Sequence, residues 1–115
     1  MRRLNRVRVV NEIEKGMLLD LKDIIAHYDS QAEIVLYGSA ARGQRRPDSD
    51  YDVVVITDRK LSPQEERDLD RDVYGLQLER GAVLSVMVYA KEQWMNPVFQ
   101  ASPYKRNVIR EGIIL

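Results

Sequence analysis

Apolar residues recur along the chain with two different periods, and these periods predict where helices and strands lie. Short apolar runs bounded by polar residues or glycine predict strands at residues 32–37, 51–57 and 82–89. The run at 51–57 is nearly continuous in apolar residues, which is typical of a strand buried on both faces. Steps of three and four residues before the first strand predict an amphipathic helix, and its apolar positions are Val10, Ile13, Met17, Leu21, Ile24 and Tyr28.

The helix expected between the second and third strands carries its own start and stop signals. Ser62 is placed as an N-cap, Pro63 occupies the first helical position, and Glu65 completes a capping box. Gly81 can end the helix in a left-handed turn. The predicted core stripe of this helix is Leu69, Val73 and Leu76.

Shorter elements are expected in the last quarter of the chain. Residues 91–95 favour one helical turn, anchored by Trp94 and stopped by Pro97. A serine and a proline then open a helix over 102–112, whose ends carry Ser102 and Gly112. Residues 113–115 are interpreted as a short edge strand or a partner-binding tail. The apolar positions of the last helix are Tyr104, Val108 and Ile109.

The order helix, strand, strand, helix, strand, helix predicts an α+β, two-layer fold, with helices packed on a small mixed β-sheet. We expect residues 1–115 to form a single domain with a modest core. The 18 basic and 18 acidic side chains balance, so no overall basic field indicates nucleic acid as the partner. Absent cysteine excludes disulfides and thiolate metal sites. With no signal peptide and no run long enough to span a bilayer, we expect a cytoplasmic protein without membrane partners.

Charge is nevertheless unevenly distributed along the chain. Residues 1–8 are rich in arginine, and we expect them to form a solvated, partly mobile basic terminus. The alternative is contact with RNA or with a triphosphate tail. His27, the only histidine, is expected near a helix end in a structural or solvated role. The terminal arginines are Arg2, Arg3, Arg6 and Arg8.

Two neighbouring stretches carry the residues that phosphate and metal chemistry require. The first strand ends at Gly38, where the backbone can approach a ligand, and Ser39 adds a hydroxyl and an N–H at the mouth of a short helix. Asp50 and Asp52 lie two positions apart at the start of the next strand and therefore point the same way. The two carboxylates repel each other unless a cation lies between them. A set of oxygen ligands favours a hard ion such as magnesium. The alternative is a turn followed by two solvated aspartates.

This arrangement resembles a known family. A Gly-Ser pair at 38–39, ten intervening residues and an Asp-x-Asp at 50–52 are similar to the signature of the DNA polymerase beta nucleotidyltransferase superfamily. The nearest resemblance is to its minimal (MNT-type) nucleotidyltransferases, small proteins often paired with HEPN-domain partners. The order of elements fits that polymerase-beta-like fold across most of the chain.

The resemblance implies roles for five residues. Asp50 and Asp52 would be the catalytic metal ligands, and Gly38, Ser39 and Arg42 would bind the nucleotide. It implies Mg²⁺ or Mn²⁺ as the cofactor and ATP as the substrate. Two metals would clamp the attacking and leaving oxygens of an in-line displacement at the α-phosphorus.

One element of the superfamily pattern is missing. A third carboxylate, which helps bind a metal and activates the acceptor hydroxyl, is expected within residues 83–88, where Ser85 is the only polar residue. A serine hydroxyl is a poor, neutral metal ligand and a weak base. Losing a general base typically slows transfer by about 10²–10⁴-fold. Asp72 and Glu79 on the preceding helix are the only candidate substitutes considered, and we interpret both as ordinary charges of the helix face.

Three functions remain open on these grounds. In the first, the protein transfers AMP from ATP to a hydroxyl, and the resemblance implies a tyrosine of a HEPN-type toxin, which would make the protein an antitoxin. In the second, it is a catalytically weakened nucleotide- or toxin-binding module. In the third, it modifies a small molecule such as an aminoglycoside, and a homodimer would be needed to build the acceptor pocket.

Overall fold

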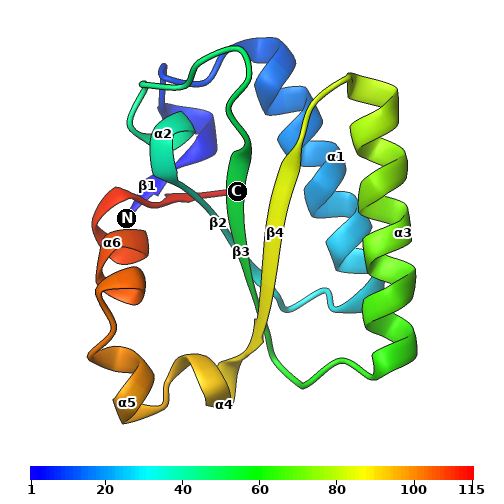
Figure 1. Cartoon of the computed structure of the whole chain (residues 1–115), viewed down its shortest axis with the longest axis vertical. Helices are drawn as coiled ribbons and strands as arrows, with labels where there is room; N and C mark the ends of the chain where they lie inside the picture. Colours follow the sequence, from blue (N-terminus) through cyan, green and yellow to red (C-terminus); the bar gives the residue numbers. More distant parts are fainter.

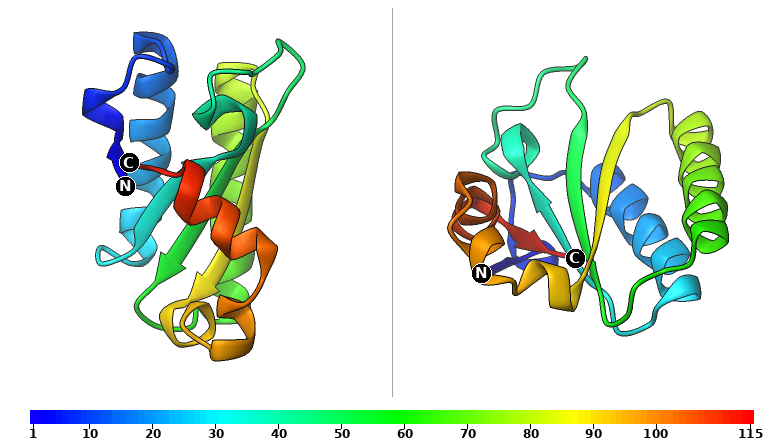
Figure 2. Two further views of the ribbon diagram at one scale, coloured as in Figure 1. Left: turned by 90° about the vertical axis from the view of Figure 1, so that its left-hand side faces the viewer. Right: turned by 60° about the horizontal axis from the view of Figure 1, so that its bottom comes forward.

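The computed structural model describes all 115 residues and contains one five-stranded mixed sheet with the strand order β1-β5-β2-β3-β4. Helices lie on both faces of the sheet: α1 and α3 side by side on one, and the shorter α4, α5 and α6 on the other (Figures 1 and 2). The predicted α+β class and mixed sheet are confirmed, and the short helices on the second face add a layer to the two that were predicted (Figure 2). The elements are β1 (Arg2–Arg3), a 3-10 turn η1 (Leu4–Arg6), α1 (Glu12–Tyr28), β2 (Glu33–Tyr37), α2 (Gly38–Ala41), β3 (Tyr51–Thr57), α3 (Pro63–Arg80), β4 (Leu84–Ala90), α4 (Lys91–Trp94), α5 (Pro97–Gln100), α6 (Pro103–Glu111) and β5 (Ile113–Ile114).

The first helix is the one that the periodicity predicts, but its buried stripe is shifted. Asn11 and Glu14 form a capping box at its start. Ile13 was expected in the core and is instead 78% exposed. In the first turn, Glu14 faces the sheet instead. Its carboxylate accepts a hydrogen bond from the Tyr51 hydroxyl at 2.7 Å. The buried residues of α1 are Met17, Leu18, Leu21 and Ile25.

Helix α3 agrees with its sequence signals at both ends. The Ser62 hydroxyl accepts from the Glu65 N–H at 3.1 Å, and the Glu65 carboxylate accepts from the Ser62 N–H at 2.9 Å. Gly81 closes the helix with φ +63°, in the left-handed region that favours glycine. The three predicted core residues, Leu69, Val73 and Leu76, are all buried.

Strand β3 is the centre of the sheet and is buried on both faces, as predicted. It pairs antiparallel with β2 and parallel with β4, so the end of β2 and the starts of β3 and β4 meet at one end of the sheet. In this register Tyr37 lies opposite Asp52, and Asp52 lies opposite Ser85. The sheet therefore brings together three segments that are separated in sequence.

On the second face, Trp94 is buried as the predicted anchor of α4. Pro97 does not simply stop that turn, because it opens the separate helix α5, where the Asn96 side chain caps the Val98 N–H. Lys105 of α6 is also buried, and its ammonium donates to the Trp94 carbonyl at 2.6 Å. Burial lowers the pKa of this lysine.

The last helix buries a narrower stripe than expected. Val108 is buried, whereas Ile109 is 53% exposed, contrary to the sequence prediction. One residue corresponds to a rotation of about 100° around a helix, so the residue after Val108 points away from the sheet.

Both ends of the described chain enter the sheet. Strand β5 pairs antiparallel with β2 and parallel with β1, so the expected edge strand at 113–115 is an interior strand instead. The side chains of Arg2 and Arg3 are exposed, as expected, while their backbone forms β1, and Leu4 is buried. The predicted mobility of residues 1–8 stays a prediction. None of the helices combines the length and apolar character needed to cross a bilayer.

Candidate active site

The turn after β2 requires glycine for two reasons. Gly38 has φ +74°, a conformation that other residues adopt only with strain. A Cβ at this position would also clash with the Asp52 carboxylate, whose Cγ lies 3.2 Å from the ideal Cβ position. Ser39 follows as the second residue of α2 and is half-buried, and its carbonyl accepts the Gln44 N–H at 2.8 Å. The predicted glycine–serine turn and the acid pair are therefore direct neighbours.

Asp50 and Asp52 share one face at the start of β3. Tyr51 between them is buried in the core formed with α1 and α3, so the two acids point to the opposite face. Asp50 is exposed and Asp52 is half-buried. Burial, and secondly the Asp50 carboxylate, raise the pKa of Asp52, while Arg42 acts in the opposite sense. Two neighbouring carboxylates of this kind favour binding of a cation between them.

Ser85 occupies the place on the neighbouring strand where a third carboxylate was expected. Its hydroxyl donates to an Asp50 carboxylate oxygen at 3.2 Å. The substitutes considered from sequence are in the wrong place: Asp72 and Glu79 line a groove between α1 and α3 on the other face of the sheet, and Asp72 accepts a hydrogen bond from the Tyr28 hydroxyl. Asp72 and Glu79 are therefore charges of the helix face, as the sequence favoured, and neither can replace the third carboxylate.

The donor set fits one hard divalent cation. No group of three or more histidine, cysteine, aspartate or glutamate side chains is arranged to hold a metal. Magnesium, however, usually uses one or two protein carboxylates and completes its shell with water and substrate phosphates. Asp50 and Asp52 supply such a pair. Burial and, secondly, repulsion from Asp50 raise the pKa of Asp52, and a bound cation would offset that repulsion.

Sequence reasoning missed Glu111, the last residue of α6. Its carboxylate accepts the Gly38 N–H at 3.2 Å and the Arg42 guanidinium at 3.0 Å, and its side chain is only 13% exposed. Arg42 also donates from Nε to the Gln44 side chain at 3.1 Å. The only sequence signal for Glu111 is weak: an acid in the last turn opposes the helix dipole.

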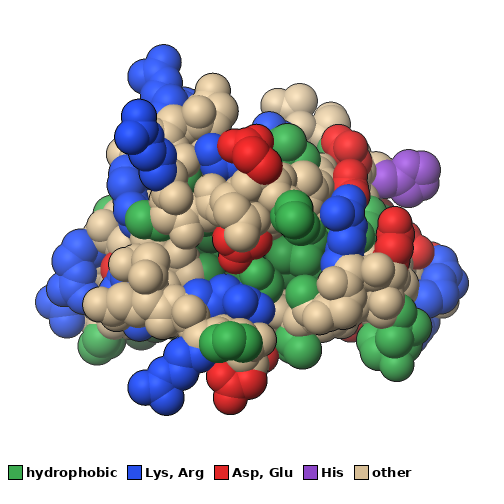
Figure 3. Space-filling model, turned by 90° about the horizontal axis from the view of Figure 1, so that it is seen from above, with side chains coloured by type: hydrophobic (Ala, Val, Ile, Leu, Met, Phe, Trp, Pro, Cys, Tyr) green, Lys and Arg blue, Asp and Glu red, His purple; other side chains and the backbone are tan.

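Arg45, in the loop after α2, is not directed at the acid pair. Arg45 lies over the Tyr51 ring, 4.2 Å from its centroid, and Tyr51 faces the opposite side of β3 from the two aspartates. Arg46 is exposed. Seen from the end of the molecule that carries α2 and this loop, the largest group of basic side chains lies along the left side, and acidic side chains lie among further basic ones toward the middle and right (Figure 3).

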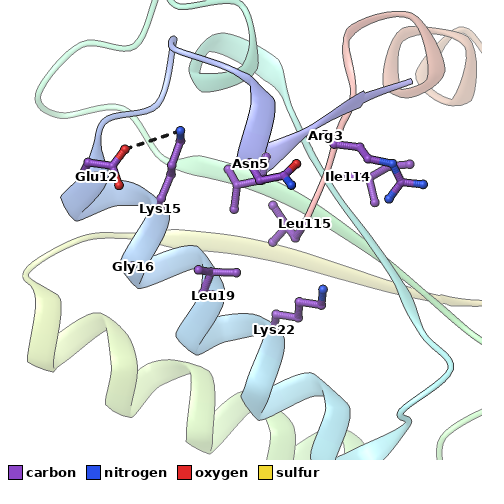
Figure 4. A pocket seen from close by; sticks show the side chains of 10 residues that line it. Arg3, Asn5, Glu12, Lys15, Gly16, Leu19, Lys22, Ile114 and Leu115 are labelled. Atoms are coloured by element: carbon purple, nitrogen blue, oxygen red, sulfur yellow. Dashed lines mark ion pairs between the residues drawn. The ribbon is translucent and has the colours of Figure 1, made fainter.

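A cavity of about 570 Å³ lies away from this end of the sheet, between α1 and the strands β1 and β5. Figure 4 shows basic side chains from both sides of it, with Lys15 paired to Glu12 at 3.7 Å. None of the residues predicted to bind nucleotide or metal lines this cavity. The candidate active site is therefore the exposed end of the sheet itself.

Comparison with known protein families identifies the family to which this site and fold belong. Residues 18–115 match the family model described as "Nucleotidyltransferase domain", and this match includes the glycine turn, the acid pair, Ser85 and Glu111. The chain belongs to this family. The predicted nucleotidyltransferase resemblance is thereby confirmed at the level of the domain.

A solved structure supports the same fold for this nucleotidyltransferase domain. It is described as "Structure of putative minimal nucleotidyltransferase", and it superimposes with a TM-score of 0.53 and 18% sequence identity over 96% of this chain and 98% of that one. At this identity the likeness shows the fold. No curated protein matches the chain.

Proposed function

We propose that this nucleotidyltransferase domain is a metal-dependent enzyme that transfers AMP from ATP to a hydroxyl acceptor. The single observation that carries the proposal is the contact between the turn at Gly38 and the carboxylate of Asp52. A backbone N–H suited to phosphate thus lies beside an acid pair suited to a divalent cation. A triphosphate with its metal satisfies both groups at once.

The geometry supports the following roles. Asp50 and Asp52 would hold Mg²⁺ or Mn²⁺, which when bound would offset negative charge on the reacting phosphates. The Gly38 N–H and the Arg42 guanidinium would bind phosphate oxygens, and Ser39 lies at the same turn. In the transfer, the acceptor oxygen forms a bond to the α-phosphorus as the bond from that phosphorus to pyrophosphate breaks. Pyrophosphate leaves with the electron pair of the broken bond, and the acceptor's hydroxyl proton passes to solvent water at the open end of the sheet.

The missing third carboxylate bears on the choice of acceptor. Ser85 is neutral and its hydroxyl already donates to Asp50, so it is a weak base for the acceptor proton. A phenol, with a pKa of about 10, is more acidic than an alkyl alcohol and needs less help to ionise. With only a weak base at the site, a tyrosine is the favoured acceptor.

The open side of the site suits an acceptor carried by a protein. Ser85 is half-buried, and Met87, two residues further along the same face of β4, is 48% exposed. Together with the resemblance to minimal nucleotidyltransferases paired with HEPN-domain partners, this exposure leads us to propose a tyrosine of a HEPN-type toxin as the acceptor, which gives the protein an antitoxin role.

Transfer is tested with ATP labelled on the α-phosphate, Mg²⁺ or Mn²⁺, and a purified HEPN-type partner. We expect the partner to become labelled, and Asp52→Asn to abolish labelling. The matched control is Asp58→Asn, which removes an exposed acid just beyond the other end of β3. Equal labelling by wild type and Asp52→Asn would refute the enzyme proposal.

A second candidate is a nucleotide- or toxin-binding module without turnover. The hydrogen bond from Ser85 to Asp50 favours it, because a hydroxyl stands where the superfamily pattern calls for a carboxylate. In that case the protein would bind ATP and the partner with no transfer of label.

A further inference from the structure

We propose that the Glu111 carboxylate occupies the phosphate subsite of the nucleotide-free protein and is displaced when the nucleotide binds. The subsite consists of the Gly38 N–H and the Arg42 guanidinium. The inference rests on the proposed function and adds an internal competitor to that same site.

The hydrogen bonds carry this assignment. One Glu111 oxygen accepts the Gly38 N–H at 3.2 Å, and the other accepts Arg42 Nη1 at 3.0 Å. A phosphate group bound there would present two oxygens to the same two donors, and charge-assisted bonds of this type are the strongest available to either ligand. The carboxylate and a phosphate therefore exclude each other.

Close packing of the next residue, Gly112, holds Glu111 at the subsite. A Cβ on Gly112 would lie 2.6 Å from Val35 Cγ1 and 2.5 Å from the Val108 carbonyl oxygen, so only glycine lets α6 end this close to β2. The Gly112 N–H donates to the same Val108 carbonyl at 2.8 Å. The position of Glu111 thus follows from close packing of the helix end.

Arg2 joins the ends of the two helices that meet at the subsite. Its Nη2 donates to the Ala41 carbonyl at 2.8 Å and to the Glu111 carbonyl at 2.6 Å. The backbones of α2 and α6 are therefore held together, and the carboxylate can leave the subsite by rotation of its own side chain. Displacement requires no movement of either helix.

The charges around the Glu111 carboxylate make it easy to displace from the subsite. The carboxylate lies at the negative end of α6, where the helix dipole disfavours it. Besides Arg42, its only other ion-pair partner is Arg110, which is largely exposed and 3.9 Å away. A triphosphate with its metal offers Arg42 a more highly charged partner. Because the nucleotide must displace Glu111, the contact lowers the apparent affinity for nucleotide. In the nucleotide-free protein the same contact keeps the Arg42 side chain oriented.

The test compares Glu111→Gln, which keeps the shape of the side chain and removes its charge, with the wild type. The control is Glu79→Gln, which removes an exposed acid on α3, on the other face of the sheet. Binding of ATP with Mg²⁺, of pyrophosphate and of adenosine is measured by calorimetry. We expect Glu111→Gln to bind ATP and pyrophosphate about tenfold more tightly, with adenosine unchanged.

Glu111→Asp provides a second variant, because its shorter carboxylate keeps the charge but cannot span both donors. We expect its ATP affinity to lie between those of the wild type and Glu111→Gln. Equal or weaker ATP binding by Glu111→Gln would overturn the inference, as would a gain limited to pyrophosphate. An equal gain with Glu79→Gln would do the same, because it would indicate a general charge effect.

The Gly38 amide resonance separates this inference from the proposed function. We expect ATP with Mg²⁺ to shift that resonance in the wild type, and Glu111→Gln to shift it without ligand. If all variants bind ATP equally and still transfer label, the displacement inference fails and the function stands. If no variant binds ATP, both fail.

Discussion

Gly38 lies so close to the Asp52 carboxylate that the structure leaves no room for a side chain between the turn and the acid pair. The sequence neighbours of Gly38 and Asp52 do not by themselves bring the two residues into contact. The antiparallel register of β2 and β3, which sets Tyr37 opposite Asp52, brings them together.

Gly38→Ala is expected to abolish nucleotide binding and to destabilise the fold. The left-handed backbone costs alanine about 1–2 kcal/mol, and the clash with Asp52 adds to this penalty. Gly81→Ala is the matched control, because Gly81 has a similar φ of +63° with open space around its Cβ position. Urea unfolding and ATP titration measure the two effects. Equal losses of stability in the two variants would show that Asp52 does not crowd the turn.

Ser85→Asp is expected to increase transfer of label by roughly 10²-fold or more, because it restores a carboxylate beside Asp50. Met87→Asp is the control, since it adds the same charge two residues further along the same face of β4. Initial rates at saturating ATP make the comparison. No gain, with metal binding unchanged, would mean that Ser85 is not the position of the third ligand.

Asp52→Asn is expected to stabilise the metal-free protein at neutral pH. The folded-state pKa of Asp52 is raised by burial and by Asp50, so ionisation of Asp52 opposes folding, and the penalty appears as pH rises through that pKa. Below the unfolded pKa of about 3.9 the wild type and the variant should be equally stable. Thermal unfolding with and without Mg²⁺ is the measurement, and the cation should stabilise the wild type alone. Stabilisation of both proteins by Mg²⁺ would place the metal elsewhere.

Glu65→Gln is expected to weaken the start of α3 in a pH-dependent manner. Hydrogen bonds from Arg59, and then from the Ser62 backbone, lower the pKa of Glu65 to about 2. Because the folded pKa is depressed, its stabilisation is fully present above the unfolded pKa of about 4.3 and is lost as pH falls through about 2. Urea unfolding should therefore separate the variant from wild type at neutral pH and not at about pH 2. Glu66→Gln, an exposed neighbour, should show no such difference.

Several features were predictable because their causes are local. The cap formed by Ser62 and Glu65, the left-handed end at Gly81 and the buried strand β3 each depend on residues within a few positions of one another. The glycine–serine turn and the spacing of Asp50 and Asp52 are local in the same sense. Sequence also marked Ser85 as the only polar residue of its strand, and the register of β3 and β4 places it beside the acid pair.

By itself, the sequence determined the longer helices, the long strands and the residue types available for phosphate and metal, because periodicity, capping and turn chemistry act over short distances. Only the tertiary structure decided that the two-residue strands β1 and β5 join the sheet and that Asp72 faces α1. It also decided that Glu111 reaches Gly38 and Arg42. These contacts join residues 44 or more positions apart. They depend on how whole elements pack, and no local pattern encodes that packing.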